Sequence, residues 1–71
     1  MEMLILKTDI NNSDDFSTVR NRLDDSYRIN ECTIDLEDKD KVVRIIGDDI
    51  EVKDVVGSIK SFGFLCEELP D

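Results

Sequence analysis

The side chains best suited to chemistry in this chain are two cysteines and a series of acids, and histidine is absent. Cys32 and Cys66 lie too far apart to form the C-x-x-C pair typical of zinc and redox sites. The sequence contains neither a histidine base nor a G-x-S-x-G turn, which are features typical of nucleophilic catalysis. We therefore expect no enzymatic activity and no cofactor.

Both cysteines alternate with apolar residues inside predicted strands. Cys32 shares a face with Ile34, and Cys66 shares one with Phe64. We expect both thiols to pack against the helices as small apolar groups. The cysteines fall on opposite edge strands of the predicted sheet, three spacings of about 4.8 Å apart, and this separation excludes a disulfide.

The acidic stretch 9–15 has two interpretations. Asn12 followed by Asp15 resembles a capping box, and acids in a first helical turn suit the helix dipole. Alternatively, oxygen ligands around Asn12 and Asp15 bind a divalent cation weakly, although the spacing typical of calcium loops is missing. Capping is the interpretation that we favour.

The remaining pattern predicts the elements that position these residues. Apolar residues alternate or cluster in four short segments, and they recur at helical spacing in two others. Gly63 is placed to end the second helix, and Gly57 inside it is expected to permit close approach to the sheet. The predicted elements are strands 3–8, 29–36, 41–46 (closed by Gly47) and 64–69, and helices 12–25 and 51–62.

The order β-α-β-β-α-β predicts an α+β, ferredoxin-like sandwich. In this fold a four-stranded antiparallel sheet has both helices on one face. The first and third strands are central, and the second and fourth form the edges. We expect one domain spanning residues 1–71.

Spaced residues from four parts of the chain, taken in order, form a set that covers nearly its whole length. They are Ile10-x-Asn12-x-x-Asp15-x-x-x-Val19-x-x-x-Leu23, Ile29-x-x-Cys32-x-Ile34-Asp35, Val43-x-Ile45-x-Gly47 and Val55-x-x-Ser58-Ile59-x-x-x-Gly63-Phe64. This set resembles the heavy-metal-associated domain of copper chaperones and metal-transporting ATPases. The resemblance implies the same ferredoxin-like fold.

In that family the first segment reads Met-x-Cys-x-x-Cys, and its cysteines bind the metal. This chain has Ile10, Asn12 and Asp15 at those positions, and Phe64 where bacterial members often place a tyrosine. Soft cations such as Cu(I) are selected by thiolates, so the resemblance does not carry metal binding over to this chain.

We interpret the chain as a non-catalytic heavy-metal-associated-like domain that acts as a protein-interaction module without soft-metal binding. The alternative is a metal-binding or metal-trafficking protein with an acidic, non-cysteine site around Asn12 and Asp15.

Charge and length limit the possible partners. The 71 residues carry 18 acids and 9 bases, a net charge of −9. Nucleic acids and anionic membranes are therefore disfavoured as partners. We find no membrane span and no signal-peptide pattern at the start, and we expect a cytoplasmic protein.

One surface is predicted to bind a partner. The sheet face opposite the helices should display an apolar stripe with a polar rim, which is typical of interaction surfaces. The partner is either an unknown protein or a second copy of the chain. The residues expected there are Ile5, Val42, Arg44, Ile46 and Leu65.

Overall fold

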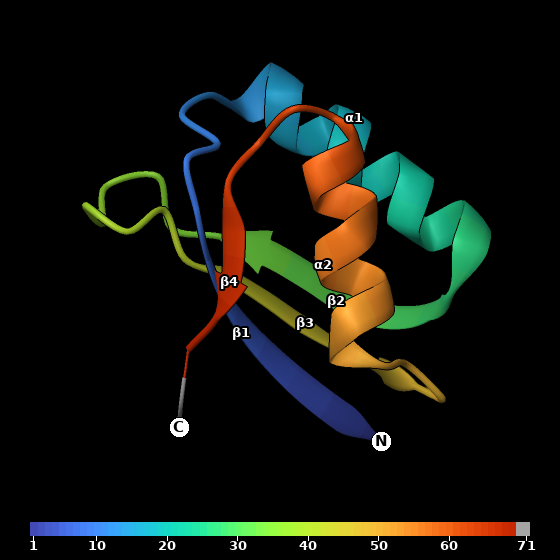
Figure 1. The fold of residues 1–71 in the computed structure, drawn as a ribbon. Helices are drawn as coiled ribbons and strands as arrows, with labels where there is room; N and C mark the ends of the chain where they lie inside the picture. Colours follow the sequence, from blue (N-terminus) through green and yellow to red (C-terminus); the bar gives the residue numbers. More distant parts are fainter. Residues whose placement is uncertain (70–71) are drawn as a thin grey trace.

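The computed structural model describes residues 1–69, so the last two residues of the predicted 1–71 domain lie outside it. Six elements follow one another in the expected order (Figure 1). They are β1 (Glu2–Thr8), α1 (Ser13–Ser26), β2 (Arg28–Ile34), β3 (Val43–Asp48), α2 (Val52–Ser61) and β4 (Cys66–Glu68).

The four strands form one antiparallel sheet in the order β2-β3-β1-β4. Figure 1 shows both helices on the same side of this sheet. The predicted ferredoxin-like fold is confirmed, with β1 and β3 central and β2 and β4 at the edges.

The core lies between the sheet and the two helices. The strands contribute alternate residues, and each helix contributes the stripe that its period predicts. The fully buried side chains with the largest volumes are Leu6, Ile10, Leu23, Ile45, Ile59, Val19, Val43 and Val55.

The connection between β2 and β3 is longer than predicted. Asp35 accepts a hydrogen bond from the N–H of Glu37 at 3.1 Å, and this bond begins a turn after Ile34. The turn ends at Lys41, which has a left-handed φ of 45° and donates its N–H to the carbonyl of Asp38. These local bonds compete with strand pairing, so β2 ends before the predicted residue 36 and β3 begins after the predicted residue 41.

Gly47 was expected to close the third strand, but it lies inside β3, opposite Ile29. A Cβ at this position would overlap the carbonyl oxygen of Arg28 on β2. The pairing shifts register between Ile29 and Glu31, as in a β-bulge. Gly47 therefore permits a close strand contact beside this bulge.

The two ends of α2 differ in how well the sequence predicts them. Gly63 has φ +92° and donates its N–H to the carbonyl of Lys60, so its predicted role at the helix end is confirmed. The prediction for Gly57 is wrong, because Gly57 is exposed and a Cβ there would meet nothing within 4 Å. Gly57 does not mark close packing of α2 on the sheet.

Neither of the helices found in residues 1–69 has the length and apolar character that a membrane span requires.

Substitutions of Gly57 and Gly63 by alanine are predicted to have opposite effects on stability. Gly57→Ala removes backbone freedom from the unfolded chain without a clash, so we expect it to stabilise the protein by about 0.5–1 kcal/mol. Gly63→Ala forces a Cβ into a left-handed backbone and should destabilise it by roughly 1–2 kcal/mol. Urea unfolding measures both, and a loss of stability in Gly57→Ala would contradict this description of α2.

Candidate functional site

The loop between β1 and α1 is organised by hydrogen bonds between its own residues. The Asn12 Oδ1 accepts the backbone N–H of Asp15 at 2.8 Å. The Asn12 Nδ2 donates to the Asp15 Oδ2 at 3.0 Å and to the Asn11 Oδ1 at 3.1 Å. Asn12 is therefore the N-cap of α1, as predicted, and Asp15 returns a side-chain bond to it.

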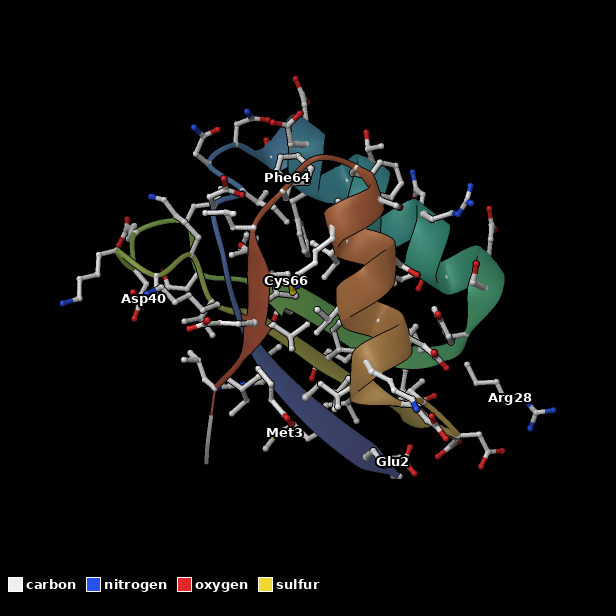
Figure 2. All side chains as sticks on the ribbon, viewed as in Figure 1. Glu2, Met3, Arg28, Asp40, Phe64 and Cys66 are labelled. Atoms are coloured by element: carbon white, nitrogen blue, oxygen red, sulfur yellow. The ribbon has the colours of Figure 1, made fainter. Side chains whose placement is uncertain are left out.

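A second contact ties this loop to the segment before β4. The Asp9 Oδ1 accepts the backbone N–H of Leu65 at 2.8 Å. Phe64 lies in the same segment, packs partly buried against the core, and is labelled near the start of α1 in Figure 2. Sequence reasoning missed this tie, because Asp9 and Leu65 are 56 residues apart and neither lies in a recognisable motif.

The side chains of the loop do not fit a soft metal ion. Asn12 and Asp15 offer a carboxamide and a carboxylate, which are hard oxygen donors, whereas Cu(I) selects thiolates. Within residues 1–69, no group of three or more His, Cys, Asp or Glu side chains is arranged to hold a metal ion. The structure brings Asn12 and Asp15 together, and their side chains hydrogen-bond to each other.

The two cysteines lie in the core, on opposite edge strands (Figure 2 labels Cys66 between β4 and α2). Burial raises the pKa of Cys32 to about 11, with smaller opposing influences from the Arg20 and Asp24 charges. Burial likewise raises the pKa of Cys66 to about 11. At neutral pH both thiols are protonated, so neither is a ready nucleophile or metal ligand.

The residues predicted for the sheet face do not all lie together. Ile5 on β1 pairs with Arg44 on β3, and Ile46 is on the same face of β3. Val42, half-buried, comes just before β3. We refer to this face, opposite the helices, as the outer face.

Leu65 lies apart from the centre of the outer face. Its backbone is bonded to Asp9, whereas Ile46 pairs with Met3, six residues back along β1. At about 3.3 Å per strand residue, these places are roughly 20 Å apart. Leu65 is 71% exposed, but it does not extend the apolar centre.

Met3 is the outer-face residue that sequence reasoning missed. It is 49% exposed and lies on β1 opposite Ile46 (labelled in Figure 2). The signal was present in the sequence, because Met3 alternates with Leu4 and shares the face of Ile5.

Comparison with solved structures identifies domains of the same fold. The yeast copper-transporter domain Ccc2a, solved in apo and Cu(I)-loaded states, has a TM-score of 0.85 and 22% identity, covering 100% of this chain and 99% of that chain. A copper-binding domain of HMA7, a P-type ATPase, has a TM-score of 0.81 and 15% identity, covering 99% and 96%. A chain of the Atx1–Cu(I)–Ccc2a complex has a TM-score of 0.84 and 22% identity, covering 100% and 99%.

No protein-family model and no curated protein matches this sequence. At the identities above, the likeness to solved structures establishes the fold of heavy-metal-associated domains. The fold implied by the sequence resemblance is therefore confirmed.

The buried thiols make stability depend on pH at the alkaline end. In the unfolded chain they ionise near 9.0, whereas in the folded chain they keep their protons to about 11. Their contribution is fully present below about pH 9, and the unfolded state binds fewer protons above it. We therefore expect stability to fall as pH rises from about 9 to about 11.

Urea unfolding midpoints across this range measure the effect. A Cys32→Ala/Cys66→Ala variant is the control, since it retains every other alkaline titration. Its midpoint should fall less steeply with pH, and identical slopes in the two proteins would contradict the burial of the thiols.

Proposed function

We propose that this chain is a heavy-metal-associated-like domain that acts as a non-catalytic protein-interaction module and does not carry soft metal ions. The observation that carries the proposal is the pairing of Asn12 with Asp15 at the start of α1. These are the positions where the resemblance would place the metal-binding cysteines.

The hydrogen bonds of the loop support the first half of this proposal. The Asn12 Oδ1 accepts one hydrogen bond and the Asn12 Nδ2 donates two, so a cation bound at this oxygen would compete with the Asp15 N–H that caps α1. The thiols elsewhere in the fold are buried and protonated. The groups that would otherwise bind metal therefore serve the stability of the fold.

The outer face supports the second half. Its apolar residues point away from both helices, and Met3, near the start of β1, is half-exposed on it. One neighbour, Ccc2a, is known in a complex with Atx1, so a domain of this fold engages a protein partner in that case. An open sheet face with an apolar centre is suited to such a contact.

A Cu(I) competition assay tests the loss of metal binding. The reduced wild-type chain should leave Cu(I) on a chromophoric chelator, because its loop offers only oxygen and amide donors. The matched control is Asn12→Cys/Asp15→Cys, which places two thiols at a helix N-terminus, where thiolates are favoured.

The double variant should withdraw Cu(I) from the chelator, and each single variant should do so far less. Withdrawal by the wild-type chain would contradict the proposal. Amide shifts at residues 11–16 on addition of Ca²⁺ or Mg²⁺, abolished by Asp15→Ala, would instead assign the loop to a hard cation.

Ile46→Asp tests the outer face. Ile46 is half-buried and does not belong to the core cluster, so the variant should keep its fold, as judged by the amide spectrum, and lose protein partners. The wild-type chain is incubated with a lysate of the native host, and the proteins that it retains are joined to it with an amine-reactive cross-linker. The cross-linked lysines of this chain are then mapped.

The proposal expects links at Lys7, which lies on the outer face, rather than at Lys53 and Lys60 of α2. Asp25→Asn on α1 is the control and should keep the partners. Partners that persist in Ile46→Asp, or links confined to α2, would overturn the assignment of the outer face.

A further inference from the structure

The centre of the outer face is a small apolar patch with Met3 as its most exposed side chain. Met3 pairs with Ile46, and Ile5 follows Met3 on the same face of β1. Leu69 donates its N–H to the carbonyl of Ile5 and so continues the patch beyond β4. We call Met3, Ile5, Ile46 and Leu69 the outer patch.

The charges around the outer patch are negative on balance. Lys7 lies 3.6 Å from the Asp40 carboxylate and pairs across the sheet with Glu67. Each base of this face has acids beside it, so its positive charge is locally offset.

The same holds for the two arginines of the strands on this face, since Arg28 pairs with Asp48. Arg44 lines a hollow of about 280 Å³ together with Asp35 and Asp38. Glu31 pairs with Ile46 and has no base opposite it. Counted over the strand residues of this face and the charged turn 35–41, acids outnumber bases by seven to five, a balance of −2, on a chain whose net charge is −9. The acids are Glu31, Asp35, Glu37, Asp38, Asp40, Asp48 and Glu67, and the bases are Lys7, Arg28, Lys39, Lys41 and Arg44.

Resting on the proposed function, we infer that the outer patch docks a cationic, amphipathic protein segment. Apolar side chains of this segment contact the outer patch, and its lysines or arginines face the acidic rim. Complementary charge of this kind speeds association and disfavours wrong partners.

A second copy of the chain is the competing occupant, and charge opposes it. Bringing two outer faces together would oppose two rims of the same sign on two molecules that each carry −9. An anionic partner meets the same repulsion. The cationic segment is the occupant that both the patch and the rim favour.

Three synthetic peptides test the chemistry directly. The first peptide carries leucine on one face of a helix and lysine on the other. The second peptide has glutamate in place of lysine, and the third has glutamine in place of leucine. Each is titrated into the isotope-labelled full chain, and amide and methyl spectra are recorded. We expect the first peptide to bind at least tenfold more tightly than the others and to shift Met3, Ile5 and Ile46.

Matched variants separate this site from general attraction between opposite charges. Glu31→Gln and Asp25→Asn each remove one negative charge, but only Glu31 lies on the outer face. Met3→Ser and Phe62→Ser each remove an exposed apolar side chain, and Phe62 lies at the end of α2. Glu31→Gln and Met3→Ser should weaken binding several-fold, and the two controls should not.

The outcomes distinguish the inference from the function on which it rests. Equal or tighter binding of the glutamate peptide at the outer patch would overturn the cationic partner but keep the docking face. Concentration-dependent shifts of the patch in the protein alone would assign it to a second copy. No shift with the first peptide, or shifts confined to the helices, would overturn the inference. The proposed function would still be tested separately by the cross-linking experiment.

Discussion

The mutual burial of one sheet face and two helices is the contact on which the rest of this structure depends. A chain of 71 residues buries only about 60–65% of its unfolded surface, enough for one apolar layer. Leu6 and Ile45, on the two central strands, and Val19 and Ile59, on the helices, are all fully inside this layer. Because both helices lie on one side, the opposite face of the sheet is left to solvent in the described residues. The surface proposed to bind a partner is thus a direct consequence of the size of the core.

The same layer fixes the loop before α1. Ile10 is fully buried, and the buried Thr8 donates its hydroxyl to the carbonyl of Lys41 at 2.8 Å. The loop is therefore anchored at its base, whereas Asn11 and Asn12 farther along it are exposed. The hydrogen bonds between Asn12 and Asp15 begin the helix. A cap and a metal site compete for the same few atoms, and the observed hydrogen bonds favour the cap.

The parts of the fold that follow from periodicity could be predicted from sequence. The strand order, the buried stripe of α1, the cap at Asn12 and the burial of Cys32 and Cys66 all follow from spacing and residue type. At Gly47 and in the connection between β2 and β3, the prediction was wrong because contacts between distant residues or local turn bonds decide the structure. The overlap that excludes a Cβ at Gly47 is set by Arg28 on a neighbouring strand.

The candidate surface divides in the same way. The alternation of side chains along a strand put Ile5 and Ile46 on the outer face, as the structure shows. The same alternation would have put Met3 there. Leu65 was misplaced because β4 is short, and the bond from its N–H to Asp9 is set by tertiary contact. No sequence motif identifies a partner, and the cationic partner proposed above is inferred from the acids that the fold places around the outer patch.

A double-mutant cycle on the loop between β1 and α1 measures whether the hydrogen bonds between the Asn12 and Asp15 side chains stabilise the fold. Unfolding free energies are measured for wild type, Asn12→Ala, Asp15→Ala and the double variant. We predict a favourable coupling of about 0.5–1 kcal/mol between the two side chains. Additive effects, with no coupling beyond about 0.3 kcal/mol, would contradict the account, because both side chains would then be available to a ligand.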